Sequence, residues 1–181
     1  MEERVGEAFA GTERLTVVGR HLHADDPAPD FRLDYLDLAD LAIRTISLAD
    51  STGMVRLLNV VNSLERPLCQ LVTRQWEALC VALPSNACIY TVSMDSPQMQ
   101  AHWQDTAGVL HQALSAQRSE QFGQDYGVWL KDWRLLQRAV FVIDRNDRIV
   151  YAEYVADQLR EPDYPAALQA LRQAAGNDGE A

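Results

Sequence analysis

The sequence predicts an α/β fold in which helices flank a central mixed β-sheet, with a β-hairpin extension at the N-terminus. Short apolar runs of strand length alternate with helical segments over residues 55–107. Two further strand-like runs follow, joined by a tight turn, and a last helical segment comes near the C-terminus. Strands joined through helices pair in parallel and strands joined by a tight turn pair antiparallel, so the sheet is mixed.

The N-terminal part contains two short apolar runs. They are residues 15–18 (LTVV) and 31–33 (FRL), and they flank Pro27 and Pro29. Prolines between short strand-like runs are typical of turns. We expect an N-terminal hairpin or an extended lead-in.

The central part reads as a β-α-β-α unit. Residues 55–61 (VRLLNVV) suit a buried parallel strand, and residues 67–83 suit a helix with a proline in its first turn. Residues 87–94 form the second apolar run. Residues 95–97 (DSP) then offer a helix cap and a first-turn proline for another helix.

The C-terminal part predicts a hairpin and a helix. The hairpin strands are residues 139–143 and 148–154, and the helix covers residues 163–174. A length of 181 residues with 48% hydrophobic content suits one domain with a sizeable core. We expect that domain to cover residues 1–175, and residues 176–181 to form a flexible tail.

The charge of the chain excludes some partners. The formal net charge is −10, and the arginines are scattered. This argues against nucleic acid and against an anionic membrane as partner. The first ten residues lack the apolar core of a signal peptide, and no apolar run reaches the length of a membrane span. We expect a soluble, cytoplasmic protein.

Three cysteines, Cys69, Cys80 and Cys88, occur without CxxC spacing, which fits neither a disulfide scaffold nor a zinc site. Cys69 lies in the first turn of the helix predicted after residue 66. Unpaired backbone N–H groups and the helix dipole favour thiolate there. The same position also suits a small buried side chain, so location alone leaves both interpretations open.

The order of elements is that of the thioredoxin fold. Within it, five stretches are distinctive: residues 57–61 (LLNVV), 92–97 (VSMDSP), 122–128 (FGQDYGV), 138–144 (RAVFVID) and 161–168 (EPDYPAAL). Through these stretches the sequence resembles the thiol peroxidase branch of the peroxiredoxins over residues 10–172. In that family the peroxidatic cysteine opens the helix, and Cys69 matches it. The resemblance also identifies Arg138 with the family's distant arginine, which would hold the thiolate and polarise the peroxide.

The loop before Cys69 departs from the family's Pro-x-x-x-Thr-x-x-Cys motif. Asn62 replaces the proline and Arg66 replaces the threonine, whereas Ser63 matches the family's serine. We therefore predict Asn62, Ser63 and Arg66 as substrate-binding residues. A threonine hydroxyl accepts and donates hydrogen bonds, but a guanidinium only donates. Arg66 either stabilises negative charge beside Cys69 or pairs with an acid such as Glu65 and blocks the site.

A second departure concerns regeneration of the thiol. The position of the family's resolving cysteine is Gln104, with Trp103 beside it, and no cysteine follows Cys88. Cys80 lies 11 residues after Cys69 on one helix, or about 16 Å at about 1.5 Å per residue. Cys88 belongs to a strand expected to be buried. We predict no intramolecular resolving cysteine.

Other candidate residues have simpler explanations. His21 and His23 lack a third ligand and are expected to face solvent, and His102 and His111 have no recognisable partner, so we predict no metal site. Trp129 and Trp133 lie in a segment that, by the resemblance, could line a pocket or a dimer contact, but packing is the simpler explanation. Asp37, Asp40 and Asp50 fit a solvated loop or helix face.

The resemblance implies a thiol peroxidase, for which we expect no cofactor, and the missing resolving cysteine makes a one-cysteine mechanism the leading hypothesis. Its substrate would be hydrogen peroxide or an alkyl hydroperoxide. An external thiol, such as a thioredoxin-like protein or a low-molecular-weight thiol, would reduce it. A catalytically weakened protein that senses peroxide or binds a partner is the alternative. General thiol-disulfide exchange is a third possible function, but the lack of a CxxC motif argues against it. The resemblance also implies a homodimer.

Overall fold

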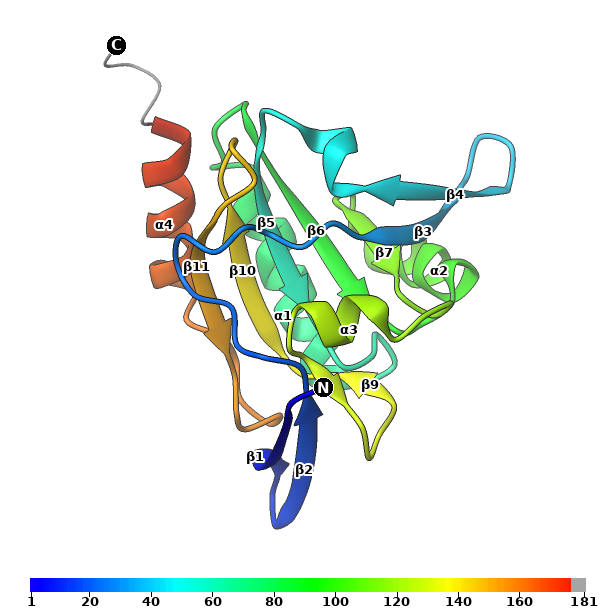
Figure 1. Ribbon diagram of the computed structural model, residues 1–181. Coiled ribbons are helices and arrows are strands. Elements are labelled where there is room, and N and C mark those ends of the chain that lie inside the picture. The colour runs from blue at the N-terminus through cyan, green and yellow to red at the C-terminus, as the bar shows by residue number, and fades with distance from the viewer. Residues whose placement is uncertain (177–181) are drawn as a thin grey trace.

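A computed structural model describes residues 1–176 of the chain. Its largest sheet has seven strands in the order β11-β10-β5-β6-β7-β3-β4 (Figure 1). Strands β5, β6 and β7 are parallel, and the others pair antiparallel. The predicted mixed sheet with flanking helices is therefore confirmed. The strands of this sheet are β3 (Arg32–Asp37), β4 (Ala42–Ser47), β5 (Val55–Val60), β6 (Ala87–Ser93), β7 (Gln112–Ser115), β10 (Ala139–Ile143) and β11 (Ile149–Tyr154).

A smaller antiparallel sheet lies at one end of the molecule, with strand order β1-β2-β8-β9 (Figure 1). Its strands are β1 (Glu3–Ala10), β2 (Glu13–Val18), β8 (Trp129–Leu130) and β9 (Leu135–Leu136). The hairpin of β1 and β2 confirms the expected N-terminal extension. Residues 15–18 pair within it, whereas residues 32–37 join the large sheet, so the two runs that flank Pro27 and Pro29 belong to different hairpins.

Helices α1 (Pro67–Cys80) and α4 (Tyr164–Gly176) cover one face of the large sheet. Trp76 of α1 and Leu171 of α4 pack there against Leu57 and Val140, all of them fully buried. The next residue along β5, Leu58, packs on the opposite face, because side chains alternate along a strand. The helix α4 ends at Gly176, where we expected the tail to begin, and residues 177–181 lie outside the described part.

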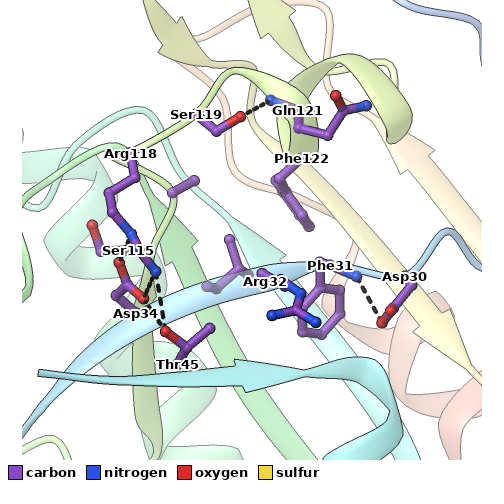
Figure 2. A pocket seen from close by; sticks show the side chains of 12 residues that line it. Asp30, Phe31, Arg32, Asp34, Thr45, Ser115, Arg118, Ser119, Gln121 and Phe122 are labelled. Atoms are coloured by element: carbon purple, nitrogen blue, oxygen red, sulfur yellow. Dashed lines mark hydrogen bonds and ion pairs between the residues drawn. The ribbon is translucent and has the colours of Figure 1, made fainter.

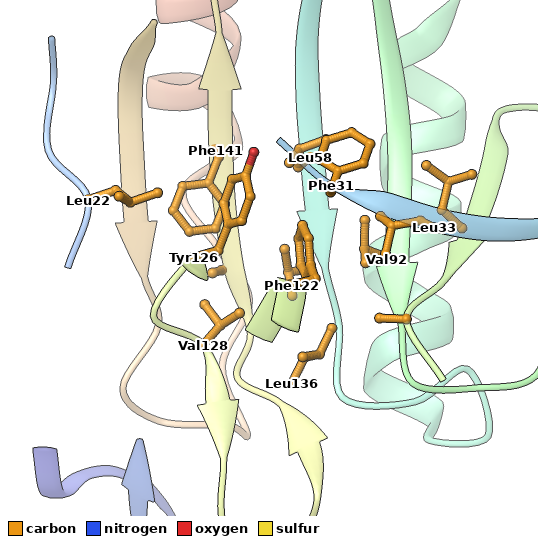
Figure 3. Packing of buried hydrophobic residues seen from close by; sticks show 14 of the residues in the cluster. Leu22, Phe31, Leu33, Leu58, Val92, Phe122, Tyr126, Val128, Leu136 and Phe141 are labelled. Carbon is orange, nitrogen blue, oxygen red and sulfur yellow. The ribbon is translucent and has the colours of Figure 1, made fainter. Parts of the chain in front are cut away.

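The opposite face of the sheet carries an aromatic core (Figure 3). Tyr126 stacks on Phe122, with ring centroids 4.5 Å apart, and Phe141 meets Tyr126 edge-on. The hydroxyl of Tyr126 donates to the carbonyl of Pro29 at 2.7 Å, which ties the segment after β2 to this core. The short helix α3 (Gln121–Asp125), which we did not predict, brings Phe122 into position.

Two more elements complete the described chain. The helix α2 (Pro97–Ala107) begins as predicted, with Ser96 accepting from the amide of Met99 at 3.1 Å and Pro97 in the first turn. A short 3-10 helix, η1 (Leu48–Ser51), connects β4 to β5. No helix within residues 1–176 combines the length and the apolar character needed to cross a lipid bilayer.

Candidate active site

Strand register brings Cys69 and Arg138 together. Strand β5 ends at Val60, and the loop after it leads into α1, which holds Cys69 as its third residue. Strand β10 runs antiparallel to β5, so its first residue, Ala139, pairs with Val60. Arg138 precedes Ala139 and therefore lies beside the loop.

The side chains of Cys69 and Arg138 are in direct contact and excluded from solvent. Nη2 of Arg138 donates to Sγ of Cys69 at 3.5 Å, and the two residues are 0% and 1% exposed. The same nitrogen donates to the carbonyl of Gln158 at 3.1 Å. Nε and Nη1 of Arg138 are buried without a hydrogen-bond partner among the described residues. A buried guanidinium with unused donors favours a negative charge close by.

Gln158 organises this site, and sequence reasoning missed it. Its Oε1 accepts from the backbone amide of Arg138 at 2.9 Å and from Nδ2 of Asn62 at 3.0 Å. Gln158 is only 2% exposed and follows β11 in an irregular segment. It belongs to no periodic pattern and to none of the stretches that resemble the family, so no signal in the sequence pointed to it.

Asn62 lies against the thiol. Its Nδ2 donates to the carbonyl of Leu136 at 2.7 Å as well as to Gln158, which fixes the amide. Its Oδ1 is 3.9 Å from Sγ of Cys69 and accepts from the thiol. The amide side chain therefore makes a polar contact with Cys69 where the family motif has an apolar proline ring.

The side chains of Ser63 and Arg66 make their contacts away from Cys69. The Ser63 hydroxyl donates to Asp95 at 2.6 Å, and the amide of Leu64 donates to the same carboxylate at 2.8 Å, so Asp95 holds the loop in place. The guanidinium of Arg66 lies 4.2 Å from the ring centroid of Trp133. No ion pair joins it to Glu65 or to another acid within residues 1–176.

The other two cysteines lie at the opposite end of the sheet. Cys80 ends α1, and Cys88 is the second residue of β6, beside Arg56 near the start of β5. Burial, together with the charge of Glu77 and the neighbouring Cys88, raises the pKa of Cys80 to about 11. Burial also raises the pKa of Cys88. Both thiols therefore stay protonated near neutral pH.

Two of our expectations for histidines were wrong. His111 has partners: Nδ1 contacts Glu77 at 2.6 Å, and Nε2 contacts the hydroxyl of Thr91 at 2.7 Å. Glu77 is distant from His111 in sequence, so no spacing rule could link them. His21 is half-buried, with its ring 4.4 Å from that of Tyr154, whereas His23 is exposed as expected.

The packing prediction for the two tryptophans holds. Trp129 is buried in the aromatic core, and Trp133 covers the smaller core beneath the N-terminal hairpin. Among the acids, Asp40 and Asp50 are exposed and Asp37 is half-buried at the end of β3.

A separate cleft of about 720 Å³ lies between β3 and the segment before α3 (Figure 2). Within the cleft Arg118 forms an ion pair with Asp34, with Nε 2.5 Å from the carboxylate. None of the three cysteines is among its lining residues, so it is distinct from the site at Cys69. It is lined by Asp30, Phe31, Arg32, Leu33, Asp34, Thr45, Ser115, Ala116, Arg118, Ser119, Gln121 and Phe122.

Comparison with known proteins identifies the family. The model of the AhpC/TSA family matches residues 24–152. A thiol peroxidase of Halalkalibacterium halodurans is 40% identical over 88% of this chain and 93% of its own length. A thiol peroxidase of Bacillus subtilis is 35% identical over 87% of this chain and 92% of its own length.

Solved structures share the fold. A peroxiredoxin-like protein from Aquifex aeolicus superposes with a TM-score of 0.82 at 22% identity, covering 94% of this chain and 98% of that one. A thiol peroxidase from Chromobacterium violaceum gives a TM-score of 0.81 at 21% identity, covering 96% and 98%. The chain therefore belongs to the AhpC/TSA family and, within it, to the thiol peroxidase branch of the peroxiredoxins.

Proposed function

We propose that the protein is a thiol-dependent peroxidase that reduces hydrogen peroxide or alkyl hydroperoxides at Cys69 by a one-cysteine mechanism. The observation that carries this proposal is the contact between Cys69 and the buried guanidinium of Arg138, which has two unused donor nitrogens. The family membership supports the same chemistry.

In the first step the Cys69 thiolate attacks the terminal oxygen of the hydroperoxide. The S–O bond forms as the O–O bond breaks, and the other oxygen leaves as alkoxide or hydroxide and takes up a proton. Arg138 supplies the fixed positive charge in this step. Its Nη2 contacts sulfur, and Nε and Nη1 are available for the developing negative charge on oxygen.

In the second step an external thiol attacks the sulfenic sulfur of Cys69 and releases water, leaving a mixed disulfide. A second thiol then displaces Cys69 and regenerates it. The positions of Cys80 and Cys88 at the far end of the sheet, and the raised pKa of each, argue against an internal resolving thiol. Gln104 occupies the expected resolving position and instead donates to the carbonyl of His111 at 2.7 Å.

Asn62 and Arg66 are proposed as substrate-side residues with different roles. The Asn62 amide contacts the thiol and orients it. Arg66 lies over the ring of Trp133, and we propose that it guides the peroxide by its charge instead of contacting sulfur. The Ser63 hydroxyl acts indirectly, by fixing the loop to Asp95.

We also propose that the protein is a homodimer, as the family resemblance implies. Sedimentation of the reduced protein tests this proposal.

The complete burial of Cys69 favours a second candidate, a weakened peroxidase that acts as a redox sensor or a partner-binding scaffold. A hydroperoxide reaches the sulfur only if the side chains around it move apart. A sensor would react once and persist as sulfenic acid or mixed disulfide, whereas a peroxidase would turn over.

Turnover assays with excess external thiol test the proposal. We expect peroxide to be consumed over many cycles by the wild type and by a Cys80→Ser, Cys88→Ser double variant, and not by Cys69→Ser. A double variant that reacts once and then stops would overturn the one-cysteine mechanism. A wild type that reacts only once would favour the sensor.

A further inference from the structure

Three potential metal ligands meet at the end of the sheet remote from Cys69. They are Glu77 and Cys80 of α1, and His111 just before β7. One ligand atom from each lies within 4.8 Å of the others. We propose that Glu77, Cys80 and His111 form a binding site for one divalent cation of the zinc class, separate from the peroxidase chemistry.

The arrangement is held in place before any cation binds. Glu77 and Cys80 are three residues apart on a helix, so they share a face. The carboxylate of Glu77 accepts from the backbone amides of Leu110 and His111 at 3.0 and 3.1 Å, which pins the loop to α1. These contacts use part of the lone-pair capacity of the carboxylate and leave room for a cation.

His111 has the outer partner that metal-binding histidines require. Its side chain is 5% exposed, with Nδ1 toward Glu77 and Nε2 at 2.7 Å from the hydroxyl of Thr91. With a cation on Nδ1, the ring proton resides on Nε2 and is donated to Thr91. A second hydrogen bond of this kind fixes the ring and its tautomer in known zinc sites. Thr91 is itself held by Asn59, whose Nδ2 donates to it at 3.0 Å.

The donor set selects the class of cation. A thiolate, an imidazole and a carboxylate are ligands for Zn²⁺, whereas Mg²⁺ and Ca²⁺ prefer oxygen alone. Binding of the cation displaces the thiol proton of Cys80 into solvent, and the resulting thiolate and the carboxylate together balance two positive charges. Ligand atoms on one zinc ion are at most about 4 Å apart, so rotation of the half-buried Cys80 side chain has to close the remaining gap. A cavity of about 510 Å³ borders all three residues and leaves a fourth position for water.

Metal titration of a Cys69→Ser variant tests the proposal, because this background removes the peroxidatic thiol as a competing ligand. Zn²⁺ affinity is measured by competition with a chromophoric chelator, and Co²⁺ reports sulfur ligation through its thiolate-to-metal absorption band. We expect one equivalent to bind, with the band present. Adding Cys80→Ser should abolish the band and weaken Zn²⁺ binding by about tenfold or more.

The matched control is Cys88→Ser in the same background, because Cys88 lines the same cavity but lies outside the three-residue group. We expect this control to keep both the band and the affinity, and Glu77→Gln to keep the band with weaker binding. Circular dichroism verifies that each variant is folded. Absence of a band in the parent, its persistence after Cys80→Ser, or its loss in Cys88→Ser would overturn the proposal.

Discussion

Arg138 donates to the sulfur of Cys69 across 69 positions of the sequence, at 3.5 Å and out of contact with solvent. The antiparallel pairing of β10 with β5 places the two residues side by side, and Gln158 holds Arg138 through its backbone amide and its guanidinium. Substitutions at these residues test which parts of this arrangement carry the reaction.

Replacing Arg138 by lysine keeps the positive charge but removes the planar guanidinium with its several N–H donors. A lysine cannot contact Cys69 and Gln158 while also presenting two further nitrogens to oxygen. We expect Arg138→Lys to lower the second-order rate with hydrogen peroxide by about 100-fold. Arg56→Lys is the matched control, because Arg56 is equally buried but binds the carbonyl of Asp144 far from Cys69. Equal rates in the two variants would contradict a direct role for Arg138.

Gln158 is predicted to act by positioning. In Gln158→Ala, Nδ2 of Asn62 keeps only the Leu136 carbonyl, and the buried amide of Arg138 loses its partner. We expect the free energy of unfolding to fall by about 1–3 kcal/mol. We also expect the rate of reaction with peroxide to fall by about tenfold or more, because Asn62 and Arg138 are no longer held in position. Gln137→Ala serves as control, because Gln137 is buried too but donates to Val155. A similar loss of reactivity in the control would mean that the effect is general destabilisation.

Restoring the family threonine at position 66 is expected to increase activity. Arg66 is the N-cap of α1 and makes no side-chain capping bond. A threonine there can accept from a first-turn amide, which stabilises a helix by about 1 kcal/mol. Its hydroxyl can also orient a peroxide, whereas Arg66 is engaged with Trp133. We expect Arg66→Thr to react faster with hydrogen peroxide in stopped-flow mixing. A slower variant would show that Arg66 has taken over the role of the threonine.

Glu153 should make stability depend on pH. Burial outweighs the hydrogen bonds from Asp163 and Tyr151 and raises the pKa of Glu153 above its ordinary 4.5. Above that pH the folded protein retains a proton that the unfolded chain has released, so the contribution of this group to stability falls as the pH rises through its folded-state pKa.

Glu153→Gln should remove this dependence. We expect the variant to gain stability relative to the wild type as the pH rises from below to above the ordinary pKa of a glutamate, as measured by urea unfolding over that range. The exposed Glu161 provides the control substitution, Glu161→Gln. A difference between Glu153→Gln and wild type that stays constant over this range would refute the prediction.

The parts of the fold that the sequence predicted are those with strong local patterns. The buried strand at residues 55–60, the capped helix after Ser96 and the C-terminal hairpin all formed where expected. The strands β7, β8 and β9 have two to four residues, too few for a period to emerge, and they form because neighbouring strands offer hydrogen-bond partners.

The candidate site was likewise predictable from the sequence only in part. Cys69 and Arg138 were found through motifs that resemble the family. Gln158 was not, because its role depends on contacts with Asn62 and Arg138 that only the tertiary fold creates. The position of Arg66 also needed the structure, because its partner, Trp133, lies in the turn between β8 and β9.

The most direct test of the central claim is the reaction of fully reduced protein with hydrogen peroxide and with an alkyl hydroperoxide. Stopped-flow tryptophan fluorescence follows it, because Trp103 packs in the same cluster as Cys69, and intact mass locates the added oxygen. We predict a second-order rate far above that of free cysteine and one oxygen atom on Cys69, with no such phase in Cys69→Ser. A rate like that of free cysteine, or oxidation at Cys80 or Cys88 instead, would contradict the assignment.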